Sequence, residues 1–143
     1  MTRLDRNYLL VRAGGRRVGL ALGAVVEVLE PGPAFPVPSL GPAVRGVTTV
    51  RGTLLPLVDL GALLAGRPCA AERGGATVVV QVDGRRLCFE VDDAEEVLRG
   101  GGLPVPTGAA LPWAAGIARV HEELVPLLDL DALGARITEA AAT

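Results

Sequence analysis

Short runs in which apolar residues alternate with polar or small ones recur along the chain. In the segment 16–22, Val18, Leu20 and Leu22 are separated by small residues, which is the period-two pattern of a strand with one buried face. This pattern and short apolar runs predict strands at 8–12, 16–22, 25–29, 54–58, 77–82, 85–91, 95–98, 115–120 and 124–128, and a further strand that begins at Val44. Strands this short, with turns this frequent, favour a mainly β fold over an α/β fold.

The segment 44–60 predicts a strand, a tight turn and a second strand. Gly52 marks the turn, because glycine adopts positive φ without steric cost. The apolar run 54–58 fits a short buried strand. Pro56 has no N–H to donate, so this strand should lie at a sheet edge or contain a bulge at that position.

Residues that cap or break helices lie between the predicted strands. Asp59 is the expected N-cap of a short helix, and Gly66 is its expected end. Asp129 is the expected cap of a C-terminal helix. The Pro- and Gly-rich segments 31–39 and 100–106 fit neither a helix nor an inner strand, so we expect extended connections at the surface.

The second half of the chain repeats the first. Arg16-Arg17 recurs as Arg85-Arg86, and Glu27-Val28-Leu29 recurs as Glu96-Val97-Leu98, both 69 positions later. The two repeats, about 8–66 and 77–136, predict two small SH3-like barrels. The longest match has a spacing of 70 positions without a gap: Gly46, Val47, Val50, Leu54, Leu55, Pro56, Leu57, Val58, Asp59 and Leu60 recur as Gly116, Ile117, Val120, Leu124, Val125, Pro126, Leu127, Leu128, Asp129 and Leu130.

Positions that differ between the repeats are candidates for function, because the fold explains the positions that they share. The turn Arg51-Gly52 becomes His121-Glu122 in the second repeat, while the stem of the hairpin is retained. Arg51 is therefore the first candidate for a binding residue.

Composition limits the classes of partner. Half of the 143 residues are hydrophobic but only 3% are aromatic, so the core must be aliphatic. The net charge is -2 and no basic patch is dense enough to bind phosphates, which argues against nucleic acid as a partner. The chain starts with polar residues, and its longest apolar stretch, 18–26, is too short to cross a bilayer. We therefore expect a cytoplasmic protein without direct membrane insertion.

The sequence pattern offers little for catalysis or metal binding. The single histidine, His121, has no convergent ligands at metal-site spacing, and Ser39 lies in a proline-rich connection without a nucleophile elbow. Cys69 and Cys88 are not spaced as metal ligands, and we expect a loop thiol and a buried thiol. The glycines at 100–102 lack the lysine and the helix of a phosphate-binding loop. We therefore expect no enzymatic activity and no cofactor or metal.

The segment 46–60 resembles the CheW family of chemotaxis coupling proteins. It has the family's glycine, its Arg-Gly turn and its apolar-Pro-apolar-apolar-Asp-Leu run. The segment 116–130 is similar to the C-terminal half of the family, and 8–29 is similar to its opening strands. The resemblance therefore covers about 8–133.

One residue at the hairpin tip departs from the family pattern. Thr49, directly before Val50-Arg51-Gly52, stands where the family usually has Asn. Asn adopts tight-turn dihedrals and bonds to its own backbone more readily than Thr, so the departure bears on the geometry of the turn.

The resemblance implies two intertwined five-stranded SH3-like β-barrels with a short C-terminal helix, in a single CheW-like domain over 1–143. It implies a non-catalytic adaptor without a cofactor. Its partners would be the regulatory domain of a CheA-type histidine kinase, the cytoplasmic tip of a methyl-accepting chemoreceptor and other CheW-like domains. Its location would be the cytoplasm, in receptor arrays at the inner face of the membrane.

On the family pattern, the receptor-facing groove involves Val25 and Glu27 on the third strand and Gly46 and Arg51 on the hairpin. The comparison of the repeats selects Arg51 independently. An apolar groove with an arginine at its rim can hold one helix of a receptor tip by its apolar face and bond to its polar edge.

Two other functions are open at this point. The first is a scaffold that fills positions in a kinase ring through the kinase regulatory domain, without receptor contact. The second is a small-ligand-binding module that uses the space between the barrels. Charge reversal at Arg51 separates the ring-filling scaffold from a receptor-binding adaptor.

Overall fold

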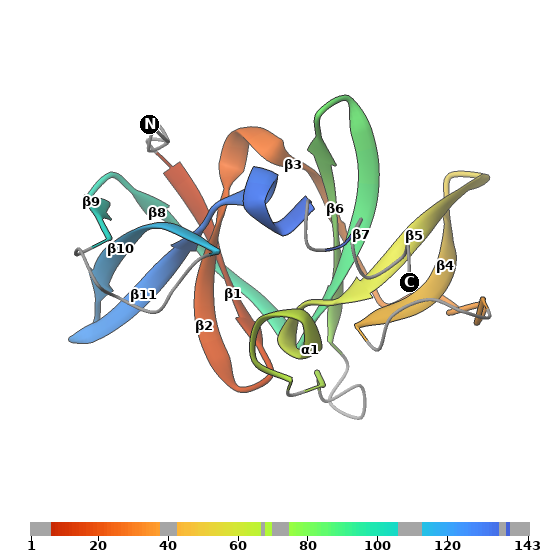
Figure 1. The fold of residues 1–143 in the computed structure, drawn as a ribbon, viewed down its shortest axis with the longest axis horizontal. Helices are drawn as coiled ribbons and strands as arrows, with labels where there is room; N and C mark the ends of the chain where they lie inside the picture. Colours follow the sequence, from red (N-terminus) through yellow and green to blue (C-terminus); the bar gives the residue numbers. More distant parts are fainter. Residues whose placement is uncertain are drawn as a thin grey trace.

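The computed structural model describes residues 7–37, 43–66, 68–69, 75–105, 113–134 and 137, and these residues form mainly β-strands (Figure 1). The named elements are β1 (Asn7–Ala13), β2 (Arg16–Ala21), a 3-10 turn (Leu22–Ala24), β3 (Val25–Leu29), β4 (Val44–Val50), β5 (Thr53–Asp59), α1 (Leu60–Ala65), β6 (Ala76–Val82), β7 (Arg85–Val91), β8 (Asp93–Arg99), β9 (Leu103–Pro104), β10 (Ala114–Val120) and β11 (Glu123–Leu128).

The strands form two sheets, and each sheet contains strands from both repeats. One sheet has the order β8-β1-β2-β11-β10-β9, and the other has the order β3-β6-β7-β5-β4. Short parallel ladders join the repeats, at Leu127 and Gly19 between β11 and β2 and from Leu57 to Asp59 between β5 and β7. Figure 1 shows the two sheets curling side by side, with the C-terminal helix between them. The predicted mainly β fold of two intertwined halves is confirmed.

Strands β1 and β6 are buried on both faces, which explains their continuous apolar runs. Leu9 and Val11 of β1 enter a cluster formed by residues of both sheets, whereas Tyr8 and Leu10 enter a cluster confined to the first sheet. In β6, Val79 packs within the second sheet, and its neighbours face the shared cluster. Each such buried Val or Leu side chain stabilises the fold by roughly 1.5–3 kcal/mol.

The predicted helix caps are confirmed. The Asp59 carboxylate accepts a hydrogen bond from the Ala62 N–H at 3.0 Å, and helix α1 ends at Gly66, whose φ is 68°. Asp129 accepts one from the Ala132 N–H at 3.2 Å, and residues 130–134 are helical. No helix in the described ranges is long and apolar enough to span a membrane.

The prediction that 54–58 is a buried strand is correct only for its second half. Leu54 is 63% exposed, whereas Leu57 and Val58 are buried. The first half of β5 pairs only with β4, and the ladder with β7 begins at Leu57. Pro56 precedes that ladder, so its missing N–H leaves no gap in it even though β5 is an inner strand of its sheet.

The two predicted connections run along the outer sides of the hairpins. In the first, Phe35 and Val47 exchange two backbone hydrogen bonds of 2.8 and 3.0 Å. The second contains β9, a two-residue strand that the sequence analysis did not predict, paired with β10. Residues 38–39 and 106 of these connections lie outside the described residues.

Candidate functional site

Arg51 and Glu27 form a bidentate ion pair between the tip of the β4–β5 hairpin and β3. Arg51 Nη2 and Nε donate to Glu27 Oε2 at 2.9 and 3.3 Å, and Nε also lies 3.2 Å from Oε1. Arg51 and Gly52 have φ of 49° and 82°. Positive φ at both central residues is the geometry of a type I′ hairpin turn, which places the Arg51 side chain over β3.

The ion pair leaves part of the guanidinium free for a partner. The side chain of Arg51 is 78% exposed, whereas that of Glu27 is 21% exposed. The hydrogen bond from Arg51 lowers the pKa of Glu27 below its ordinary value, so the pair is charged at neutral pH. Arg51 can therefore orient on Glu27 and still present N–H groups to solvent.

A pocket of about 170 Å³ lies beside this ion pair, and we call it the rim pocket. Its inner part is apolar and its rim carries Arg51, Arg86 and Glu27. It is lined by Val26, Glu27, Val50, Arg51, Thr53, Leu55, Val79 and Arg86. An apolar floor with cations at its rim suits a partner segment that carries both apolar and polar side chains.

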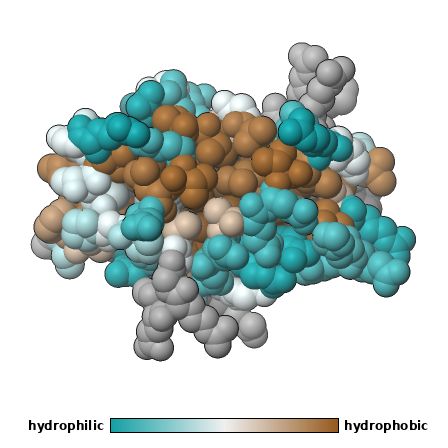
Figure 2. Space-filling view, turned by 180° about the vertical axis from the view of Figure 1, so that it is seen from behind, coloured by the Kyte–Doolittle hydropathy of each residue, from teal (hydrophilic) through white to brown (hydrophobic). Residues whose placement is uncertain are grey.

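One apolar residue of the rim pocket is itself exposed. Val26 of β3 is 40% exposed, whereas Leu54 of β5, 63% exposed, lies on the face of its strand opposite to Thr53 and Leu55. Figure 2 shows a band of hydrophobic side chains between hydrophilic ones on the face opposite that of Figure 1. Exposed apolar residues gathered in this way are typical of protein-binding surfaces.

The structure brings together two of the four residues expected in the groove. Arg51 and Glu27 are paired, but Val25 is partly buried and packs against the shared core. Gly46 lies against Phe35, where an added Cβ would clash with the Phe35 carbonyl oxygen. In place of Val25, the neighbouring Val26 faces the pocket. The bulge of β3 between Val25 and Glu27 causes this change of face.

Thr49 lies inside β4 and not in the turn. It pairs with Leu54, and the residues with positive φ are Arg51 and Gly52. A residue in extended backbone does not need the dihedrals that Asn adopts more readily than Thr. The replacement of Asn therefore has no backbone cost in this turn.

The second repeat carries a side-chain contact at the matching positions. His121 Nε2 lies 3.2 Å from Glu96 Oε1, at the positions that correspond to Arg51 and Glu27. His121 and Glu122 have φ of 48° and 64°, so the turn geometry is also shared. Contact between the tip and the strand is thus a property of both repeats, and the bidentate arginine is specific to the first.

Sequence reasoning missed Val26 and Arg86, which both line the rim pocket. A signal was available for Val26, which matches Glu95 in the other repeat, but none for Arg86, which matches Arg17. The substitution of a charged residue by valine at matched positions marks a place where the two repeats differ in chemistry.

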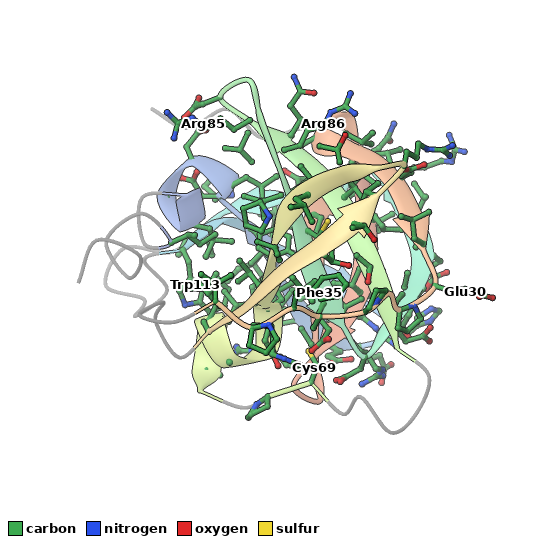
Figure 3. All side chains as sticks on the ribbon, turned by 90° about the vertical axis from the view of Figure 1, so that its right-hand side faces the viewer. Glu30, Phe35, Cys69, Arg85, Arg86 and Trp113 are labelled. Carbon is green, nitrogen blue, oxygen red and sulfur yellow. The ribbon has the colours of Figure 1, made fainter. Side chains whose placement is uncertain are left out.

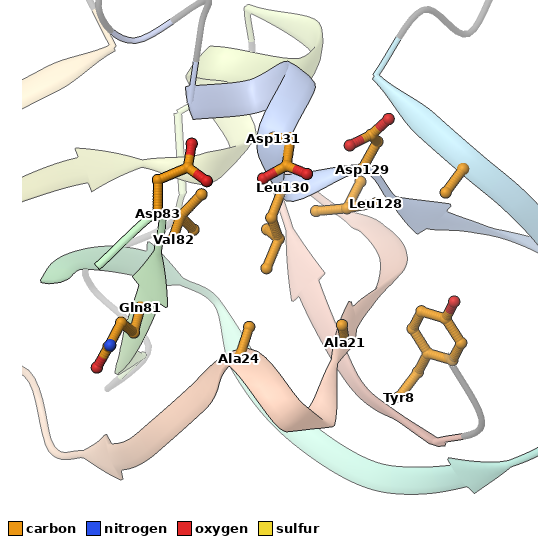
Figure 4. A pocket seen from close by; sticks show the side chains of 11 residues that line it. Tyr8, Ala21, Ala24, Gln81, Val82, Asp83, Leu128, Asp129, Leu130 and Asp131 are labelled. Carbon is orange, nitrogen blue, oxygen red and sulfur yellow. The ribbon is translucent and has the colours of Figure 1, made fainter. Parts of the chain in front are cut away.

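A second pocket, of about 210 Å³, is lined by residues of both sheets and of the turn before the C-terminal helix. Its polar side chains are those of Tyr8, Gln81, Asp83, Asp129 and Asp131 (Figure 4). Within the described ranges, no group of three or more His, Cys, Asp or Glu side chains is arranged to hold a metal ion.

Both cysteines are buried. Cys69 lies in a loop, as expected, but its Sγ donates to the Glu90 carbonyl oxygen at 3.3 Å and the residue is 8% exposed. Burial raises the pKa of Cys69 to about 12 and that of Cys88 to about 11. Neither thiol is therefore activated as a nucleophile.

Comparisons with known proteins agree on one family. Residues 7–137 match the family model described as the CheW-like domain. "Chemotaxis protein CheW" of Rhizobium meliloti (strain 1021) is 27% identical over 139 residues, covering 93% of this chain and 90% of that protein. "Probable chemotaxis protein CheW" of Rhizobium etli (strain ATCC 51251 / DSM 11541 / JCM 21823 / NBRC 15573 / CFN 42) is 26% identical over 144 residues, covering 96% and 93%.

A solved structure has the same fold. The scaffolding protein TtCheW from Thermoanaerobacter tengcongensis superimposes with a TM-score of 0.80 over 92% of this chain and 89% of that one. Its sequence is 18% identical, so the likeness concerns the fold.

Proposed function

This chain belongs to the CheW-like family, and we propose on that premise that it is a non-catalytic coupling adaptor of a chemosensory pathway. The observation that carries the proposal is the family match over 7–137, which spans nearly the whole chain as one CheW-like domain. The chemotaxis protein and the scaffolding protein to which it is similar support the same role. In this role the protein works in the cytoplasm, in receptor arrays at the inner face of the membrane.

The proposed partners are a CheA-type histidine kinase, bound through its regulatory domain, and the cytoplasmic tip of a methyl-accepting chemoreceptor. The rim pocket is the proposed receptor surface. Its apolar lining can take the apolar face of one helix, while Arg51, held by Glu27, bonds to the polar edge of that helix. An adaptor needs separate surfaces for its two partners, and the residues that line the rim pocket all come from one of the two sheets and its hairpin turn.

The test uses the purified chain, the cytoplasmic fragment of a chemoreceptor and the regulatory domain of a kinase from the same organism. We expect the wild-type chain to bind both partners. The Arg51→Glu variant should no longer bind the receptor fragment, because the substitution places a second carboxylate beside Glu27. It should still bind the kinase domain. Arg85→Glu is the matched control, since it makes the same charge change outside the rim pocket.

Each of the other outcomes has a definite meaning. Binding of the kinase domain without the receptor fragment would favour a ring-filling scaffold over a receptor coupler. Receptor binding that is unchanged by Arg51→Glu would place the receptor surface elsewhere. Binding of neither partner would contradict the adaptor role itself.

A further inference from the structure

Arg17 of the first repeat sits in a closed network of ion pairs. Its Nε donates to Glu95 Oε1 at 2.7 Å, and its Nη1 lies 3.1 Å from Glu123 Oε2. Arg12 reaches the same Glu95, with Nε at 3.4 Å from Oε2. The side chain of Arg17 is only 13% exposed. The network therefore spans the first sheet from β8 to β11.

Arg86 holds the position of Arg17 in the second repeat, and the backbone around it matches. Arg17 pairs with Arg12 across β1 and β2, as Arg86 pairs with Gln81 across β6 and β7. The bulge of β8 in the first sheet corresponds to the bulge of β3 in the second. The two arginines can therefore be compared through their neighbours.

The carboxylates that surround Arg17 are replaced by uncharged residues around Arg86. The place of Glu95 is taken by Val26, and that of Glu123 by Thr53. Both replacements line the rim pocket together with Arg86. Among the described residues, the exposed Arg86 donates a side-chain hydrogen bond from Nε to Gln81 Oε1 at 3.4 Å.

The balance of charge differs in the same direction. Around Arg17, the carboxylates of Glu95 and Glu123 balance the positive charges of Arg17 and Arg12. At the rim pocket, Arg51 and Arg86 face the single carboxylate of Glu27, which is already paired with Arg51. The rim pocket thus has an excess of one positive charge and an open volume of about 170 Å³ where the first sheet has glutamate side chains.

We propose that Arg86 receives an acidic side chain of the receptor tip, which occupies in trans the place that Glu95 and Glu123 occupy around Arg17. The proposal deepens the proposed function and rests on it. The partner segment is a helix with a Glu or Asp next to apolar residues: its carboxylate pairs with Arg86, and its apolar residues cover Val26 and Leu55. A guanidinium suits this role because its planar donors match a carboxylate.

Neutralising Arg86 is the first test, with the receptor cytoplasmic fragment as the probe. Arg86→Gln should weaken the affinity of the chain by about tenfold, as expected for loss of one charge-assisted contact. Arg85→Gln makes the same change of charge on the neighbouring residue, and Figure 3 shows the two side chains on different sides of β7. Arg85→Gln should alter the affinity by less than about twofold.

The second test adds carboxylates to the lining of the rim pocket. The double substitution Val26→Glu and Thr53→Glu rebuilds around Arg86 the carboxylates that surround Arg17. It should abolish receptor binding and retain kinase-domain binding, whereas the uncharged pair Val26→Gln and Thr53→Gln should weaken receptor binding less. In the receptor fragment, one acidic residue changed to its amide should show no further loss in the Arg86→Gln background, because the two groups form one interaction.

The outcomes separate this proposal from the proposed function. If the wild-type chain binds the receptor fragment and Arg51→Glu abolishes binding, but Arg86→Gln does not weaken it, the role of Arg86 is wrong and the adaptor role stands. Equal losses for Arg85→Gln and Arg86→Gln would also overturn the role of Arg86, because they would show a general effect of charge. If the wild-type chain does not bind the fragment, both proposals fail.

Discussion

Arg17 of β2 and Glu95 of β8 form an ion pair between the two repeats, with Arg17 Nε 2.7 Å from Glu95 Oε1. Strand β1 separates the strands of these two residues in the sheet, so the pair reaches across β1. The Arg17 hydrogen bond holds the pKa of Glu95 below its ordinary value of 4.5. The strength of this contact within the first sheet therefore depends on the protonation of Glu95.

Stability should depend on pH through Glu95. Its folded-state pKa is lowered, so its contribution is present above the unfolded-state pKa and is lost as the pH falls through the folded-state value. The difference in unfolding free energy between the wild type and Glu95→Gln should be constant near neutrality and shrink below about pH 4.5. Urea unfolding at a series of pH values measures it. A difference that does not vary with pH would show that only packing is affected.

Gly46 should tolerate alanine much less well than Gly52, although both have positive φ. At Gly46, where φ is 130°, the added Cβ clashes with the backbone of Phe35, whereas at Gly52, where φ is 82°, the space is open. We expect Gly46→Ala to cost about 3 kcal/mol or more and Gly52→Ala about 1 kcal/mol. Chemical denaturation of both variants measures the costs. Equal costs would contradict a role of Gly46 in packing against the connection.

Asp59 should contribute more to stability than its repeat equivalent Asp129. Both cap a helix, but Asp59 is 2% exposed and accepts the buried Cys69 N–H at 3.0 Å, whereas Asp129 is only partly buried. We expect Asp59→Ala to cost at least about 2 kcal/mol, because it also leaves a buried N–H without its acceptor, and Asp129→Ala about 1 kcal/mol. Thermal and urea unfolding of the two variants provide the comparison. A larger cost for Asp129→Ala would contradict this ranking.

The two cysteines should react slowly with thiol reagents in the folded protein. Both are buried, and burial raises their pKa to about 12 for Cys69 and about 11 for Cys88. We expect labelling at pH 8, followed by mass spectrometry, to proceed at the rate at which the protein opens. Urea should accelerate labelling of both thiols. Fast labelling of either thiol without denaturant would show that its site opens readily.

Much of the fold was predictable because its signals are local. The strands 25–29 and 85–91 begin and end where the pattern places them, and the other predicted strands differ by one or a few residues. The caps at Asp59 and Asp129 follow from side chains that bond to the nearby backbone. Strand β9 was missed because two residues of a Pro- and Gly-rich connection carry no periodic pattern.

The candidate site was predictable only in part. The repeat selected Arg51 because it differs from His121, and the resemblance supplied Glu27, but their bidentate contact joins residues 24 positions apart. Val25 was expected to face the groove, yet the bulge in β3 turns Val26 toward it. A bulge changes which face a residue occupies, and alternation along the strand does not reveal it.

The residues of this chain specify the strands, turns, caps and duplication, because each depends on propensities and contacts within a few positions. Tertiary structure decides what surrounds the two matched arginines. Arg17 pairs with glutamates of β8 and β11, while Arg86 lines the rim pocket together with Val26 and Thr53 of the other repeat. Because the repeats exchange strands between sheets, the neighbours of each arginine come from distant parts of the chain. The same residue type is therefore enclosed in one sheet and open to a partner in the other.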